Sequence, residues 1–187
     1  LLFIFFFVRY TSNAQSVTVK GNFMPFLIYH AGYYKAQLGV EYLDSANKGY
    51  FIHYVFEVAN YYSYKSANKF KGGVNIPFGK NKLPFFLNTA IVYGRNYGKG
   101  TVEATGIKNY RIDEQNYGLN IGLGKKLRLA KKISYETIIG VYPYYTHSNT
   151  LIDYSDGSRK FIDRGVKLEL APYINCTFTY NFPFHKK

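Results

Sequence analysis

The stretch that decides the fold is residues 34–42, which read YKAQLGVEY. Its even positions carry Tyr34, Ala36, Leu38, Val40 and Tyr42, and its odd positions carry Lys35, Gln37, Gly39 and Glu41. This two-residue alternation is the period of a β-strand, whose successive side chains point to opposite faces, and not the 3.6-residue period of a helix. The segment is therefore predicted to be a strand with one apolar and one polar face.

The same alternation recurs along the chain, in YGLNIGLG at 117–124, VKLELA at 166–171 and INCTFTYNF at 174–182. Turn-forming residues divide the alternating stretches. The predicted strands are 17–28, 33–43, 49–60, 69–78, 84–97, 113–128, 133–146 and 162–182. The sequence therefore predicts an all-β chain of eight strands.

Short and long connections alternate between these strands. The predicted short turns are 44–48, 79–83 and 129–132, and the other connections are 29–32, 61–68, 98–112 and 147–161. Tight turns at one end and long loops at the other are typical of an up-and-down antiparallel barrel with both termini at the turn end. Pro25 interrupts the first strand, and a β-bulge is expected there to restore the register.

Composition excludes several classes of protein. The chain has 187 residues, of which 47% are hydrophobic and 20% aromatic, with a formal net charge of +13. So many bulky apolar residues exclude intrinsic disorder. The longest uninterrupted apolar run, Leu1 to Val8, is far shorter than the roughly 20 residues of a transmembrane helix. A single cysteine, Cys176, excludes an intrachain disulfide framework and a cysteine-rich zinc site.

The first residues have the pattern of a processing segment. Leu1 to Val8 is followed by the small residues Ser12 and Ala14, as in the apolar region and cleavage site of a secretory signal. Residues 1–14 are therefore predicted to be part of a signal peptide and residues 15–187 a single barrel domain. The alternative is that the apolar run is a buried first strand.

The direction of the apolar face separates a membrane barrel from a soluble, lipocalin-like barrel. An eight-stranded barrel has an interior just wide enough for side chains to fill, and the apolar faces carry too many Tyr and Phe rings for that space. We therefore expect a transmembrane β-barrel with outward rings and a packed, ion-paired lumen without an open pore. A proton or ion relay along the inward charges is the alternative. The inward set is Glu41, Glu57, Glu136 and Glu169 with Lys35, Lys71, Lys126, Arg128 and Lys167.

Two short stretches, VKGN at 19–22 and LGVEY at 38–42, resemble the opening of the small outer-membrane β-barrel proteins common in Bacteroidota, an OmpA-like or porin-family group. The junction of Ala14 and Gln15 is similar to signals of that group. Tyr180-Asn181-Phe182 resembles the aromatic-ended last strand that the barrel-assembly machinery recognises. The resemblance implies a bacterial outer-membrane location and this fold, and it implies no catalytic residues.

Chemistry-bearing motifs are sparse. Thr146-His147-Ser148-Asn149 is similar to the His-x-Ser-Asn motif of lipid A deacylases but lacks the intervening residue. Neighbouring strand residues point to opposite faces, so His147 and Ser148 are not expected to form a base and nucleophile pair. His30, His53 and His185 have no metal-ligand spacing, and Asp153–Gly157 has only part of a calcium-loop pattern. No catalytic, cofactor or metal residues are predicted.

The basic excess gathers at both predicted rims. The turn-end set is Lys80, Lys82, Lys125, Lys126, Arg128, Lys131, Lys132, Lys186 and Lys187, and the loop-end set is Lys99, Lys108, Arg111, Arg159, Lys160 and Arg164. Anionic phosphates of outer-membrane lipids and lipopolysaccharide are the expected partners, with simple solvated rims as the alternative. A secreted barrel is not expected to bind nucleic acid. The leading hypothesis is a non-enzymatic structural or binding role through the outward loops, with a lipid A-modifying enzyme and a soluble periplasmic binder of a hydrophobic ligand as alternatives.

Overall fold

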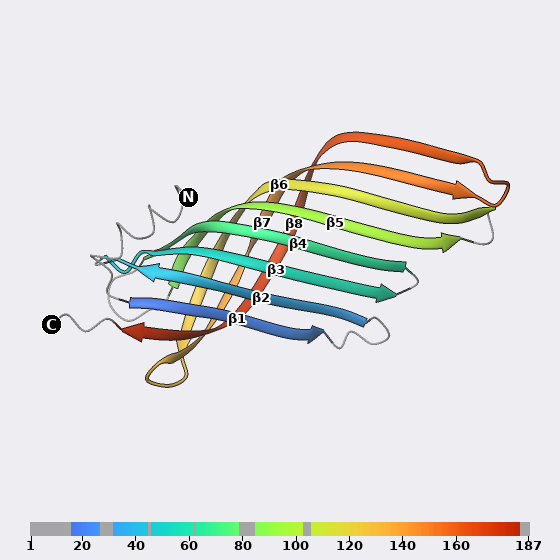
Figure 1. Ribbon diagram of the computed structural model, residues 1–187. Coiled ribbons are helices and arrows are strands. Elements are labelled where there is room, and N and C mark those ends of the chain that lie inside the picture. The colour runs from blue at the N-terminus through green and yellow to red at the C-terminus, as the bar shows by residue number, and fades with distance from the viewer. Residues whose placement is uncertain are drawn as a thin grey trace, which may run out of the picture.

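Eight antiparallel strands form the fold (Figure 1). The computed structural model describes residues 16–26, 32–44, 46–61, 63–78, 85–102 and 106–183. The strands are β1 (Ser16–Phe26), β2 (Gly32–Leu43), β3 (Gly49–Tyr61), β4 (Ser63–Pro77), β5 (Phe85–Val102), β6 (Ile107–Arg128), β7 (Ile133–Tyr154) and β8 (Arg159–Pro183). These described residues form no helix long and apolar enough to cross a membrane.

Each strand pairs with its sequence neighbour, and β1 pairs with β8 to close a barrel. One row of hydrogen-bonded partners runs Val17, Tyr42, Tyr50, Val74, Thr89, Ile121, Val141 and Pro172. Across the closing seam, however, Val17 pairs with Phe182, ten residues beyond Pro172. This stagger is the shear of the barrel, and it requires strands tilted by about 35–45° from the axis.

The seam between β1 and β8 is short. It covers only the pairs from Ser16 with Pro183 to Gly21 with Phe178, whereas β1 pairs with β2 over its whole length. Pro25 lies in the part of β1 that has no β8 neighbour, so its missing N–H removes no bond from that ladder. The bulge expected in this strand was wrong, because the pairing of β1 with β2 is continuous from Ser16 to Phe26.

The predicted strands are confirmed, but at the loop end of the barrel they are longer than predicted. The predicted connections 61–68, 98–112 and 147–161 are largely strand, because β4 begins at Ser63, β6 begins at Ile107 and β7 continues to Tyr154. The later strands are the longer ones, and they extend beyond the others at the loop end (Figure 1). We call the paired segments 95–102, 107–116, 146–154 and 159–167 the projecting sheet. The predicted signal segment 1–14 and the turn 79–83 lie outside the described residues.

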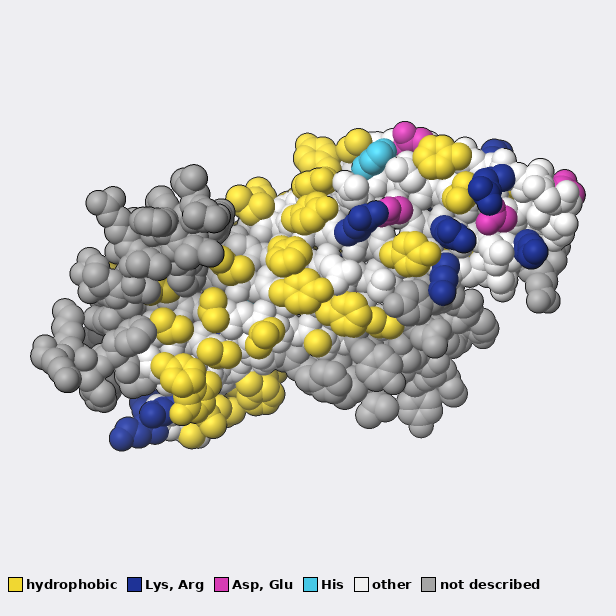
Figure 2. Space-filling view, in the orientation of Figure 1, with side chains coloured by type: hydrophobic (Ala, Val, Ile, Leu, Met, Phe, Trp, Pro, Cys, Tyr) yellow, Lys and Arg dark blue, Asp and Glu magenta, His cyan; other side chains and the backbone are white. Residues whose placement is uncertain are grey.

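The faces of the barrel are inverted relative to a soluble protein. On β2, Leu38 of the outer face is 65% exposed, whereas Glu41 of the inner face, three residues farther along, is only 2% exposed. Ile121 and Phe178 also lie exposed on the outer wall. Hydrophobic side chains gather on this outer wall over the middle of the barrel, and charged side chains are prominent on the projecting sheet (Figure 2).

Aromatic residues form a continuous row on the outer wall. Five adjacent strands, β3 to β7, place Tyr54, Phe70, Tyr93, Tyr117 and Tyr145 in one hydrogen-bonded row. The ring centroids of Tyr54 and Phe70 are 5.0 Å apart, and those of Tyr93 and Tyr117 are 5.1 Å apart. We call these five residues the aromatic row. They lie where the projecting sheet meets the barrel wall.

The interior is filled by rings that lie over glycines. A Cβ on Gly124 would come within 2.2 Å of the Phe86 ring, and one on Gly39 within 2.1 Å of the His53 ring. Both of those rings belong to buried side chains. The inward glycines therefore provide the space in which large side chains pack inside a narrow barrel.

Candidate functional site

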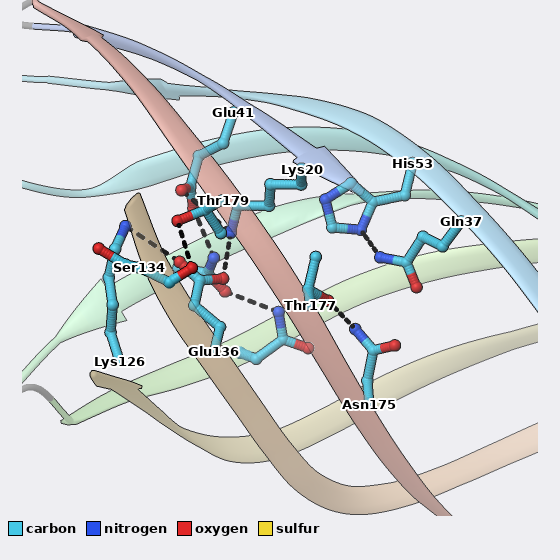
Figure 3. A network of polar contacts seen from close by, with 12 residues as sticks. Lys20, Gln37, Glu41, His53, Lys126, Ser134, Glu136, Asn175, Thr177 and Thr179 are labelled. Atoms are coloured by element: carbon cyan, nitrogen blue, oxygen red, sulfur yellow. Dashed lines mark hydrogen bonds and ion pairs between the residues drawn. The ribbon is translucent and has the colours of Figure 1, made fainter. Parts of the chain in front are cut away.

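A buried ion network crosses the lumen near the turn end, and Lys20 of β1 is its centre (Figure 3). Lys20 is 1% exposed, and its Nζ lies 3.0 Å from Glu41 Oε2 and 2.5 Å from Glu136 Oε2. Glu136 Oε1 also forms an ion pair with Lys126 Nζ at 3.0 Å. Two cations thus meet two carboxylates, and all of these side chains except the part-exposed Lys126 are buried, so each charge is compensated.

Amide and hydroxyl groups continue this network to the other side of the barrel. Tyr173 Oη donates to Asn88 Oδ1 at 2.8 Å, Asn88 Nδ2 donates to Asn75 Oδ1 at 2.7 Å, and Asn75 Nδ2 donates to Glu41 Oε1 at 2.5 Å. This chain of bonds joins β8, β5, β4 and β2. Together with Lys20, Lys126 and Glu136 it ties seven of the eight strands to one another across the axis.

β3, the remaining strand, contributes His53 to the polar interior of the barrel. Its Nδ1 lies 3.0 Å from Gln37 Nε2, and its ring stacks on Phe51 at a centroid distance of 4.5 Å. All three side chains are buried. With the neighbouring Asn175 and Thr177 pair from β8 (Figure 3), they fill the middle of the lumen.

A second charged group lies farther toward the loop end. Glu57 Oε1 lies 3.5 Å from Lys35 Nζ, and Glu57 Oε2 accepts a bond of 3.0 Å from Lys69 Nζ. Lys71, two residues from Lys69 on β4, has its Nζ 5.6 Å from the Tyr173 ring centroid. No carboxylate of the described residues lies within 4.0 Å of Lys71 Nζ.

The predicted inward charges fall into two groups. The pairs of Lys35 with Glu57 and of Lys126 with Glu136 confirm the expectation of luminal ion pairs. Three other residues of that set were misplaced. Lys167 and Glu169 are exposed because they lie where β8 has left the closed ring, and Glu169 accepts a bond from Tyr144 Oη. Arg128 is exposed at the turn, where it donates to the carbonyl groups of Ala130 and Lys131.

Lys20, the central residue of the ion network, is the residue that the sequence prediction missed. It follows Val17, Thr18 and Val19, and that alternation alone is enough to place it on the inner face. The expected shift of parity at Pro25 obscured this signal. Lys126, which the sequence placed in both the inward set and the basic turn-end set, turns inward.

A cleft of about 320 Å³ lies on the inner wall at the loop end. Its charged and amide side chains come from Glu57, Lys65, Lys69, Asn96 and Glu114. Small residues, Ser66, Ala67 and Gly98, make room for it. Along β4, β5 and β6 these residues lie closer to the loop end than Asn75, Asn88 and Lys126 do, so the cleft lies above the ion network.

The projecting sheet is exposed and charged. All six cations predicted at the loop end are exposed, although they lie in or beside strands and not in long loops. Arg95 forms a two-bond contact with Asp113, in which Nε donates to Oδ1 at 2.9 Å, and Arg159 Nε donates to Asp153 Oδ1 at 2.7 Å. Over its four segments the projecting sheet carries eight Lys and Arg against four Asp and Glu, so the sheet is basic.

A β-bulge shapes the last hairpin of this sheet. Between the pairs His147 with Val166 and Asn149 with Asp163, β8 has one residue more than β7, and Gly165 has φ of 66°. Asp163 Oδ1 accepts a bond of 2.7 Å from Gly165 N and lies 3.1 Å from His147 Nε2. The Gly165 N–H and the His147 ring hold the pKa of Asp163 below its usual value.

This contact engages His147 with a carboxylate and not with a hydroxyl. Ser148 follows His147 directly on β7 and therefore points to the other face of the sheet. The pair that a deacylase-like site needs is not brought together here. Nor do the described residues bring three or more His, Cys, Asp or Glu side chains into one group able to hold a metal.

Comparisons with known proteins support the fold. No protein-family model and no curated protein sequence matches the chain. Among solved structures, the chain is similar to the crystal structure of a major outer membrane protein from Thermus thermophilus, with a TM-score of 0.60 and 14% sequence identity. The similarity covers 89% of this chain and 99% of that one. At this identity the likeness establishes a shared fold, that of an eight-stranded antiparallel barrel.

Proposed function

We propose that this chain is a small bacterial outer-membrane β-barrel with a closed lumen and a non-enzymatic structural or binding role. The observation that carries the proposal is the inverted polarity of the wall, with apolar side chains exposed outside and ion pairs buried inside. In water such an outer surface would be costly, since soluble monomers rarely expose apolar patches larger than a few hundred Å². In a bilayer it is the expected surface.

The height of the outer wall agrees with this assignment. Ile133 lies beside the turn end of β7, and Tyr145 of the aromatic row lies twelve residues farther along the same strand. At about 3.3 Å per residue and a tilt near 40°, this span is roughly 30 Å tall. That height is close to the apolar band of about 25 Å in transmembrane barrels, which aromatic residues flank on both sides.

The lumen supports a closed barrel and not a pore. Lys20, Glu41 and Glu136 form a buried layer across the axis, and the buried rings of His53, Phe51 and Phe86 occupy further space inside the barrel. A lipocalin-like binder needs an apolar cavity in this place. The charges there favour the membrane assignment over the soluble one.

The binding role belongs to the projecting sheet. Its exposed cations fit the phosphate groups of lipopolysaccharide and other outer-membrane lipids, to which each exposed Lys or Arg near the surface contributes on the order of 1 kcal/mol. The exposed Tyr180 and Phe182 at the end of β8 fit recognition by the barrel-assembly machinery during insertion. Kinship with the small Bacteroidota-type barrels is part of the same proposal.

Heat-modifiable mobility tests the membrane assignment. Residues 15–187 are expressed behind a secretory signal of the Gram-negative host, and the membrane fraction is analysed by gel electrophoresis with and without boiling. We expect a detergent-dependent protein whose unboiled form migrates faster, because a closed barrel resists the detergent until it is heated. Recovery of the chain in the periplasmic extract without detergent would instead support the soluble binder.

A further inference from the structure

The inner wall at the loop end holds more cations than carboxylates. On β2, β3 and β4 the described residues there include four lysines, Lys35, Lys65, Lys69 and Lys71, and one carboxylate, Glu57, and the cleft is also lined by Glu114 of β6. The lysines come from two strands only, with three of them on β4 at alternate inward positions. An alternating strand thus places a column of ammonium groups on one wall.

The two carboxylates do not compensate all four lysines. Glu57 is shared by Lys35 and Lys69 at 3.5 and 3.0 Å. Glu114 accepts from the amides of Asn96 and Asn116 at 2.7 and 3.2 Å. No ion pair within 4.0 Å joins Lys65 or Lys71 to any carboxylate of the described chain. Uncompensated cations in a confined, part-buried site raise the local concentration of anions.

The cleft provides space beside these ammonium groups. Its volume of about 320 Å³ is roughly ten times the share of one water molecule in the liquid, about 30 Å³. Ala67 lies directly opposite Glu57 on β4, and Gly98 lies directly opposite Lys65 on β5, so small residues line the cleft on one side of each charged residue. Lys65 and Lys69 line the cleft itself, and Lys71 lies deeper on the same strand.

We propose that this cleft is a binding site for a phosphate-bearing anion. Lys65 and Lys69 donate to the phosphate oxygens, because charge-assisted bonds from ammonium groups to phosphate are short and strong. Lys71 lies deeper on the same strand, and Asn96, directly opposite Ala67 on the neighbouring strand β5, offers further polar contacts. The site lies on the inner wall between β3 and β6 and is distinct from the exposed cations of the projecting sheet to which the proposed function assigns lipid binding, so it goes beyond that function.

Phosphate titration of the refolded full chain in an uncharged maltoside detergent tests this site. Inorganic phosphate is added and the heat of binding is measured by calorimetry. We expect saturable binding that weakens by about tenfold or more in both Lys65→Met and Lys71→Met, as the loss of one charged contact predicts. Lys48→Met is the matched control, because Lys48 is exposed in the turn at the other end of the barrel, and its binding should equal that of the wild type.

A second probe separates the two natural sources of such a phosphate. Short-chain phosphatidylglycerol, kept as monomers, is titrated in the same way. Tighter binding of the lipid identifies a headgroup as the ligand, and tighter binding of inorganic phosphate identifies a free anion. Both outcomes support the site if Lys65→Met weakens them. Absence of saturable binding for both probes, or binding that neither Lys65→Met nor Lys71→Met changes, would overturn it. Unboiled gel mobility shows in every case whether the barrel itself is folded.

Discussion

Replacing Lys20 by Met isolates the contribution of the luminal ion network. Lys20 is fully enclosed and contacts two carboxylates, Glu41 and Glu136. Met retains most of the length and apolar volume of the lysine stem, so the substitution removes the charge and little of the packing. After the change, Glu136 retains Lys126 at 3.0 Å, but Glu41 retains only the amide of Asn75.

The expected cost follows from the carboxylate that is left behind. Removing one partner of a buried ion pair typically costs about 3–5 kcal/mol, because the other charge remains buried without compensation. We therefore expect Lys20→Met to lower the free energy of unfolding by about 3–5 kcal/mol. Replacing Glu41 by Gln in the same chain removes the orphaned charge, so the double variant should regain more than half of that loss.

The assay is equilibrium unfolding in urea of the barrel refolded into phospholipid vesicles. The unboiled gel band gives the folded fraction at each urea concentration, and the midpoint and slope give the free energy. A loss below about 1 kcal/mol for Lys20→Met would refute the reasoning. So would a double variant that is less stable than Lys20→Met alone, since the carboxylate of Glu41 would then not be the source of the cost.

Substitutions at three glycines test how glycines shape the barrel. Gly124→Ala places a methyl group against the Phe86 ring and should cost about 1–3 kcal/mol in the same assay. Gly21→Ala, whose nearest neighbour is 4.0 Å away, should leave the midpoint nearly unchanged, and equal effects of the two would contradict the packing described. Gly165→Ala puts a side chain at φ of 66° and should cost about 1–2 kcal/mol, whereas Gly165→Asn should be better tolerated. The reverse order of these two variants would show that the bulge does not depend on the left-handed conformation.

The alternation of side chains was sufficient to predict strands, faces and topology. In segments such as 34–42 every second residue is apolar, and a slip by one residue would exchange the two faces completely. Turn residues fixed the ends at 44–48 and 129–132, where the backbone reverses within a few residues. The outward orientation followed from volume, since an eight-stranded lumen has no room for so many rings.

The loop ends were harder to predict because alternation fades there. In the projecting sheet both faces are solvated, so polar residues occupy both sides of the strand and the period disappears, as in Lys108 to Asp113. The stagger of the barrel is also absent from the sequence, since it depends on how β1 meets β8. Without it, Lys167 and Glu169 could not be recognised as lying above the closed ring.

The central claim is that the apolar outer wall faces lipid, and Ile139→Arg tests it most directly. Ile139 is 61% exposed on β7 and lies six residues from both Ile133 and Tyr145, at mid-height of the wall. Phe161→Arg is the matched control, because Phe161 is 63% exposed on the projecting sheet beyond the aromatic row.

Urea unfolding in phospholipid vesicles gives the free energy of both variants. In a bilayer, Arg at mid-height should cost about 2–4 kcal/mol, whereas the control should stay within about 0.5 kcal/mol of the wild type. A stability of Ile139→Arg equal to that of the wild type, as expected for a residue that faces water, would contradict the account.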